Sequence, residues 1–270
     1  MDSMKFIKMS GCGNDFIIID NQSGLVGDHL KSILARDLCR RRHSLGADGL
    51  IFVETSRTAN IRMDFYNADG SKGEMCGNGL RCFARFVAED QICPTDMQVE
   101  TDAGLYLARL VAGDQVQLVM PPVELPKCNI TVPGLPEFSF VTVGVPHTVV
   151  FEEGSWDWPD AKLAQKGSMI RNHPYFFNGT NVNFVSREKG LKVRTYERGV
   201  EAETLACGTG ATAVALIASI LHPDTSKPVT INTKGGILQV NFQRCGNGFI
   251  DVRLQGSAIV VARGEVFPNQ

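Results

Sequence analysis

Two cysteines, each followed by Gly-x-Gly, are the residues of this chain best suited to carry chemistry. They lie in the segments Met75-Cys76-Gly77-Asn78-Gly79 and Ala206-Cys207-Gly208-Thr209-Gly210, and each segment opens a helix-like run. A thiol at a helix N-terminus meets unpaired backbone N–H groups and the positive end of the helix dipole, which both favour the thiolate. Two such thiols indicate a reaction that needs a base and an acid together.

Such a pair suits the inversion of a stereocentre that bears an acidic C–H. Inversion needs a base on one face of the carbon and an acid on the other. Proton removal next to a carboxylate builds up negative charge, which preorganised N–H donors stabilise. Helix N-termini bind anions and glycine lets the backbone approach a ligand. The predicted donors are the backbone N–H groups of Gly77, Asn78, Gly208 and Thr209.

Other roles for these cysteines compete with this one. A cysteine at a helix start is often only a small buried residue. A zinc site using Cys76 and Cys82 with a histidine would need a wider ligand spacing than the usual two to four residues. A disulfide between Cys76 and Cys207 would be an oxidised, inactive form. No metal or cofactor is expected, and the other six cysteines are predicted to pack in the interior.

The cysteine segments belong to a longer internal repeat. Alternating residues predict strands over 61–67 and 191–197, each followed by a polar loop, a cysteine and a helix, over 78–89 and 209–221. The first helix has one apolar face, and the second is almost wholly apolar and is expected to be buried on most sides. Matching β units follow, with turns at 102–104 and 234–236. The starts of the two halves align more loosely, with Asn14 opposite His147. Pro121-Pro122 and the loop-like stretch 125–134 mark the junction.

The repeat predicts an α+β fold of two pseudo-symmetric domains of similar β/α topology that face each other across a central cleft. The first domain is residues 1–122, joined by a C-terminal strand from 258–270, and the second is residues 123–257. Ligands favour clefts of this kind. Cys76 and Cys207 are therefore expected on opposite walls.

Composition limits the partners. The 270 residues are 43% hydrophobic and carry a formal net charge of −2, which does not favour nucleic acid or an anionic membrane. No apolar run approaches the roughly 18 residues of a membrane-spanning helix, and the N-terminus lacks the features of a secretory signal. We expect a cytoplasmic protein with reduced cysteines and a small-molecule partner.

The motifs together resemble the diaminopimelate epimerase family. The resemblance spans nearly the whole chain and is carried by Lys8-Met9-x-Gly11-x-Gly13-Asn14-Asp15-Phe16, Gly46-Ala47-Asp48-Gly49, Asn67-Ala68-Asp69-Gly70-Ser71, both cysteine segments, Gly179-Thr180-Asn181-Val182 and Glu197-Arg198-Gly199. It implies a diaminopimelate-epimerase-like fold, a homodimer, and cofactor-independent conversion of LL- to meso-diaminopimelate for lysine and peptidoglycan synthesis.

The resemblance also implies roles for single residues. Cys76 and Cys207 would be the acid/base thiols, with His147 and Glu197 beside them to manage protonation. Asn14, Asn67, Asn181 and Arg198 would bind the distal amino-acid end of a diamino-dicarboxylic acid. An arginine can hold a carboxylate in a bidentate fork, and asparagine amides can donate to a carboxylate or accept from an ammonium group.

Two departures from the family pattern bear on the substrate. Val145 stands where the family usually has asparagine, in Gly-Asn-Pro-His. Glu197 precedes Cys207 by ten residues, whereas Asn67 precedes Cys76 by nine. We expect looser recognition of the distal group, so that another amino acid such as glutamate is also racemised. A racemase that acts mainly on another amino acid is one alternative. A non-catalytic amino-acid-binding or redox-sensing protein is another, but it would need neither both thiols nor His147 and Glu197.

Overall fold

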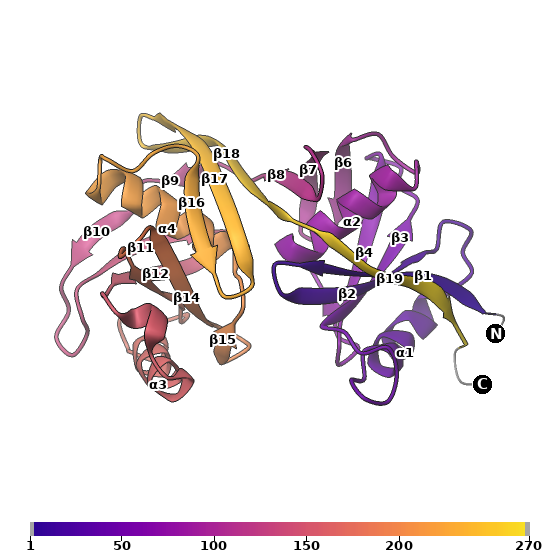
Figure 1. The fold of residues 1–270 in the computed structure, drawn as a ribbon, viewed down its shortest axis with the longest axis horizontal. Helices are drawn as coiled ribbons and strands as arrows, with labels where there is room; N and C mark the ends of the chain where they lie inside the picture. The colour runs from indigo at the N-terminus through magenta and orange to yellow at the C-terminus, as the bar shows by residue number, and fades with distance from the viewer. Residues whose placement is uncertain (1–2, 268–270) are drawn as a thin grey trace. The chain divides into compact units, whose positions relative to one another are not determined.

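The computed structural model describes residues 3–267, which divide into two compact units. The first unit runs to Leu118 and takes up the chain again from Gly256, whereas the second unit is Val119–Gln255. The C-terminal strand therefore belongs to the first unit, where it lies antiparallel to the N-terminal strand (Figure 1). Each unit is built from strands and two α-helices, as the α+β expectation required.

The first unit is a mixed sheet with a helix on each face. Its helices are α1 (Asp28–Leu38) and α2 (Gly77–Glu89). Its strands are β1 (Met4–Gly11), β2 (Asn14–Asp20), β3 (Gly49–Glu54), β4 (Ile61–Asn67), β5 (Lys72–Gly73), β6 (Asp96–Thr101), β7 (Gly104–Leu110), β8 (Gln115–Val119) and β19 (Ile259–Val266). Strands β2 and β3 are parallel, and β3 pairs antiparallel with β4.

Alternation along the strands of this unit sends side chains to two cores. Phe16 and Ile18 of β2 pack with Leu80 and Phe83 of α2. Their neighbours on β2 face the opposite side of the sheet and pack with α1. The apolar face predicted for residues 78–89 is buried, but Arg81 on the same helix is also fully buried, which the apolar pattern did not predict.

The second unit repeats this plan. Its helices are η1 (Ser155–Asp157), α3 (Asp160–Arg171) and α4 (Gly208–Leu221). Its strands are β9 (Val123–Glu124), β10 (Lys127–Ile130), β11 (Phe138–Val143), β12 (Val145–Phe151), β13 (Asn181–Ser186), β14 (Leu191–Glu197), β15 (Ala202–Thr204), β16 (Val229–Thr233), β17 (Gly236–Cys245) and β18 (Gly248–Ser257). The expectation that residues 125–134 form a loop was wrong in part, because residues 127–130 pair with β11.

Helix α4 is almost wholly apolar and is buried accordingly. Every residue from Gly210 to Ala218 is buried, as the sequence predicted for this helix. It packs on β11, β12, β13, β16 and β17. Helix α3 packs instead on β13, β14 and β15, where Leu163 and Ile170 meet Phe184 and Tyr196.

Strand register corrects one part of the sequence self-alignment. Turn Cys12-Gly13 joins β1 to β2, and Gly11 pairs with Asn14. In the second unit Gly144 alone makes the turn, so that Val143 pairs with Val145. Asn14 therefore corresponds to Val145, and the alignment of Asn14 with His147 was wrong. The counterpart of His147 is Phe16: His147 pairs with Asn181, and Phe16 with Gly49, across parallel strands.

The extra residue before Cys207 lies in the turn that follows β14. After β4 the Gly70 amide donates to the Asn67 carbonyl at 2.9 Å, whereas after β14 the Glu201 amide donates to the Glu197 carbonyl at 2.8 Å. The second turn is thus one residue longer, and Glu201 has a φ of +56°. Register then recovers, because Tyr66 pairs with Lys72 and Tyr196 with Glu203. Each cysteine follows four residues later.

Candidate active site

Both predicted acid/base cysteines are N-cap residues of helices. Cys76 precedes α2 with φ −135° and ψ 116°, and Cys207 precedes α4 with φ −119° and ψ 112°. Their carbonyls accept the first helical hydrogen bonds, from Leu80 and Ala211, both at 2.8 Å. The two thiols therefore lie where helix dipoles and first-turn N–H groups favour a thiolate.

The two thiols differ in how they meet their helices. Cys207 Sγ accepts from the Gly210 amide at 3.4 Å and lies 3.4 Å from the Thr209 hydroxyl. Cys76 Sγ makes no such capping bond. Cys207 is buried, whereas Cys76 is partly exposed. A Cβ added to Gly77 would meet nothing within 4 Å, so this part of the first helix start is open to a ligand.

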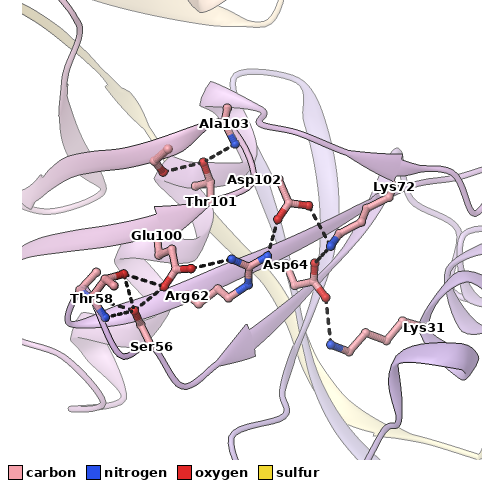
Figure 2. A network of polar contacts seen from close by, with 12 residues as sticks. Lys31, Ser56, Thr58, Arg62, Asp64, Lys72, Glu100, Thr101, Asp102 and Ala103 are labelled. Carbon is pink, nitrogen blue, oxygen red and sulfur yellow. Dashed lines mark hydrogen bonds and ion pairs between the residues drawn. The ribbon is translucent and has the colours of Figure 1, made fainter.

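Ion pairs hold β5, which leads to Cys76, against β4. Lys72 on β5 lies 3.2 Å from Asp64 and 2.8 Å from Asp102 (Figure 2). Asp64 is buried and also pairs with Lys31 of α1 at 2.9 Å. The same network continues through Arg62 to Glu100 at 2.8 Å. Helix α1, β4 and β5 are therefore linked through one carboxylate.

The second unit has the same linkage with the charges reversed. Arg194 takes the place of Asp64 on β14, and it donates to Glu203 of β15 at 2.7 Å. Arg194 also pairs with Asp160 at the start of α3, at 2.8 Å. Arg194 is nearly fully buried, and Glu203 is the partly buried carboxylate that balances its positive charge. Both cysteine segments thus follow strands that are anchored at equivalent positions.

A chain of hydrogen bonds connects the substrate-binding candidates of the first unit. Asn78 donates to Asn14 Oδ1 at 2.6 Å, and Asn14 donates to Asp48 at 3.1 Å. Arg81 donates to Asn78 Oδ1 at 2.8 Å and therefore orients its amide. Asp48 in turn pairs with Arg41 at 2.8 Å. The structure thus brings Asn14 and Asn78 together beside the start of α2.

Asn67 is the candidate of this unit that lies apart from that chain. It ends β4, as Glu197 ends β14, which agrees with the sequence self-alignment of these two residues. Its side chain is exposed and donates to Ser71 Oγ at 3.0 Å within its own turn. Its role in binding a substrate stays a prediction.

The candidates of the second unit gather at the ends of three neighbouring strands. His147 on β12 pairs with Asn181 on β13, and Glu197 ends the adjacent strand β14. Asn181 Oδ1 accepts from the Arg198 amide at 2.7 Å. The Arg198 guanidinium donates to the Asn178 carbonyl at 2.9 Å. The predicted residues of this half therefore lie at the same end of three neighbouring strands.

Burial shifts the pKa values of His147 and Glu197 in opposite directions. Burial, together with the positive charge of Arg198, lowers the pKa of His147 to about 3. Burial raises the pKa of Glu197 above its usual value of 4.5. In both cases the low-dielectric surroundings disfavour the charged form. His147 is therefore neutral at pH 7, and Glu197 holds its proton more firmly than an exposed glutamate.

Sequence reasoning missed three buried polar residues that support candidate residues, two in the second unit and one in the first. Asn183 and Thr195 lie on β13 and β14, and Asn183 contacts His147. Arg81 lies on α2 and orients Asn78. Asn183 belongs to the alternating pattern of a strand, and Arg81 interrupts the apolar face of a helix. A polar residue at an inward position is the signal that could have found them.

Within residues 3–267, no three His, Cys, Asp or Glu side chains are grouped so as to bind a metal ion. Not all of the remaining cysteines pack in the interior: Cys12, Cys39 and Cys82 are buried, Cys93 and Cys128 are partly buried, and Cys245 is exposed. None of the helices formed by the described residues has the length and apolar character needed to cross a membrane.

Solved structures with the same fold define a class of two-repeat proteins. A PhzF-family phenazine biosynthesis protein from Bacillus anthracis aligns with a TM-score of 0.72 at 14% identity, over 99% of this chain and all of the other. A hydroxyproline epimerase from Agrobacterium vitis aligns with a TM-score of 0.68 at 15% identity, over 98% of this chain and 92% of the other. At these identities the likeness shows the fold.

Sequence comparison gives the family within that class. The diaminopimelate epimerase family model matches residues 6–125 and 139–260. The diaminopimelate epimerases of Hydrogenobaculum sp. and Chlorobaculum tepidum are 42% and 41% identical, covering 87% and 96% of this chain and 90% and 99% of their own lengths. That of Moorella thermoacetica is 38% identical over 98% of this chain and 99% of its own. The chain belongs to the diaminopimelate epimerase family.

Proposed function

We propose that this protein interconverts LL- and meso-diaminopimelate by transfer of the α-proton between two thiols. The observation that carries the proposal is the equivalent placement of Cys76 and Cys207, each capping a helix after an anchored strand. Family membership supplies the substrate, because the relatives that cover nearly the whole chain are diaminopimelate epimerases. The reaction would serve lysine and peptidoglycan synthesis.

The proton balance of the reaction is simple. A thiolate takes the proton from the α-carbon, so that the C–H bond breaks and an S–H bond forms. The other thiol gives its proton to the opposite face of the carbon and becomes a thiolate. Negative charge spreads into the substrate carboxylate, which the first-turn N–H groups of α2 and α4 would stabilise. No redox change and no cofactor enter this balance.

The remaining candidates divide into two tasks. Neutral His147 and Glu197, with its raised pKa, would manage the protonation state of the thiols. Asn14, Asn67, Asn181 and Arg198 would bind the distal amino-acid end. Gly77, Asn78, Gly208 and Thr209 would supply the backbone donors at the reacting end. We propose that both half-sites serve one substrate molecule.

Solvent exchange tests the reaction directly. Purified protein is incubated with LL-diaminopimelate in deuterated water, and deuterium at the α-carbon and the appearance of the meso isomer are followed together. Deuterated meso product supports the two-thiol reaction. Binding of the substrate without exchange or inversion would favour the non-catalytic alternative.

A broader substrate range is a second candidate, and Val145 is the observation that favours it. Val145 takes the register position that Asn14 has in the first unit, and it offers no hydrogen bond there. A lost polar contact costs about 0.5–1.5 kcal/mol, so discrimination would weaken without loss of catalysis. The test is L-glutamate in deuterated water with wild type and Val145→Asn. The absence of α-deuterium from wild-type reactions would reject this candidate.

The family resemblance also predicts a homodimer, and the sequence features described above predict a cytoplasmic location. Sedimentation equilibrium at several protein concentrations measures the assembly state, and fractionation of cells that express the tagged chain measures its location. A monomer at all concentrations, or recovery outside the cytoplasm, would contradict these predictions.

A further inference from the structure

Asn183 lies behind both His147 and the Cys207 segment. It is fully buried on β13. Its Nδ2 donates to the Thr148 carbonyl at 3.0 Å and lies 3.3 Å from His147 Nδ1. Its Oδ1 accepts from the Thr195 hydroxyl at 2.9 Å. Both polar atoms of this side chain therefore contact neighbours whose hydrogen-bonding chemistry is known.

These contacts determine which way the amide points. A backbone carbonyl only accepts hydrogen bonds, so the amide atom that faces Thr148 must be the NH2 group. That same NH2 group faces His147 Nδ1, which therefore accepts and carries no proton. A neutral imidazole has one N–H, so the proton of His147 lies on Nε2.

We propose that Asn183 is a positioning residue that holds His147 as the Nε2–H tautomer. His147 then acts on the protonation of the thiols as a hydrogen-bond donor to an anion formed in the reaction, and not as a base that takes a proton from a thiol. Nε2 is buried, and none of the described residues forms a hydrogen bond with it. The inference deepens the proposed function and rests on it for the role of His147, whereas the tautomer rests on the contacts alone.

The same residue supports the loop that carries the second thiol. A Cβ added to Gly210 would lie 2.4 Å from Asn183 Oδ1 and 3.4 Å from Cys207 Sγ. Glycine is therefore required at 210 by the amide behind it. In the first unit the equivalent glycine, Gly79, packs on Ile51. The position behind the thiol helix is thus apolar in one half and holds a tautomer-setting amide in the other.

Nitrogen NMR of histidine-labelled protein tests the tautomer without any need for activity. The chain has five histidines, so the His147 signals are assigned by their loss in His147→Phe. Wild type is expected to show a protonated Nε2 and an unprotonated Nδ1 at pH 7. In Asn183→Asp a carboxylate faces Nδ1 and draws a proton to it. We expect the Nδ1 signal to move to the protonated range and kcat to fall roughly ten- to hundredfold, with KM changed less than about threefold.

Asn183→Leu provides a second variant if Asn183→Asp does not fold. It removes the amide that donates to His147 Nδ1, so both tautomers are expected to appear. Thr195→Ser keeps the hydroxyl that donates to Asn183 and should give the wild-type spectrum, and Ile51→Val is the matched control in the first unit. A wild-type ring protonated on Nδ1 would overturn the proposal, as would an unchanged spectrum in Asn183→Asp or, if that variant does not fold, in Asn183→Leu. Wild type with the Nε2–H tautomer but no turnover of diaminopimelate would refute the proposed function alone.

Discussion

The two half-sites share one backbone plan and differ in what lies behind the thiol helix. In the first unit Phe16, Ile51 and Phe65 occupy three neighbouring strands, and all three belong to the apolar core under α2. The corresponding positions of the second unit hold the polar trio His147, Asn183 and Thr195. The pairings Ile51 with Phe65 and Asn183 with Thr195 establish the equivalence.

This difference shows that equivalent positions of an internal repeat can take different roles. Buried polar side chains are tolerated where hydrogen bonds satisfy them, as Asn183 is satisfied by Thr195 and Thr148. The first unit needs only an apolar support for its helix. The second unit uses the same three positions to hold a histidine in one tautomer. Equivalent folds therefore present equivalent thiols in unequal surroundings.

Removal of either thiol should have the largest effect. Cys76→Ala and Cys207→Ala are expected to lower epimerisation at least about 1,000-fold, because each removes an acid/base group, while the circular dichroism spectrum stays unchanged. Cys→Ser variants should also be severely impaired, since a hydroxyl is a poorer base at neutral pH. Cys245→Ala, at an exposed thiol, is the matched control and should keep full activity. Full activity in either alanine variant would disprove the two-thiol mechanism.

Transplanting the polar residue into the apolar half should be costly. Ile51→Asn places an amide in the apolar core that Ile51 shares with Phe16 and Phe65, where apolar side chains cannot satisfy it. We expect a loss of about 4 kcal/mol in the free energy of unfolding, measured with urea, from lost packing and an unsatisfied amide. Ile51→Val, the control, should cost about 1 kcal/mol. Equal stability of Ile51→Asn and wild type would show that the first half does not depend on an apolar support.

The two ion pairs with reversed charges, Lys72 with Asp64 and Arg194 with Glu203, should contribute unequally to the free energy of unfolding. Glu203→Gln leaves the buried Arg194 with a single ion-pair partner, Asp160, which is almost fully exposed, so we expect a loss of about 3 kcal/mol in the free energy of unfolding. Lys72→Met should cost less than about 1 kcal/mol, because Lys72 is about half exposed and Asp64 keeps Lys31. Urea unfolding of both variants checks the order. The reverse order would mean that the anchors are not set by burial.

Acid should reveal the buried neutral histidine. The folded-state pKa of His147 is lowered to about 3 from an ordinary 6.5, so between these values the unfolded chain binds the extra proton. Stability from this group therefore rises with pH through that window, by at most about 1.4 kcal/mol per pH unit. His147→Phe, which copies Phe16, should lack this part of the slope in urea titrations from pH 6.5 to 5. An unchanged slope would place the His147 pKa near its ordinary value.

Much of the fold could be predicted because the repeated strands and helices have recognisable local patterns of polar and apolar residues. The strands 61–67 and 191–197 alternate in polarity and match the observed bounds. The helix that begins at Gly208 is apolar throughout and is buried as predicted. The turn that joins β11 and β12 was misaligned because it has one residue, Gly144, whereas the turn between β1 and β2 has two. Residues 127–130 read as a loop because their strand pairing with β11 is not visible locally.

The sequence by itself determined which residues are candidates for reaction and binding: two cysteines at helix starts, with His147, Glu197 and the asparagines of the motifs. Side-chain chemistry and spacing along the chain suffice for that. Only the tertiary structure decided their surroundings, because burial and hydrogen-bond partners depend on neighbouring strands that are distant in sequence. The pairing of β12 with β13 brings Asn183 behind His147, and the pairing of β13 with β14 adds Thr195. The tautomer of His147 is therefore a property of the folded sheet.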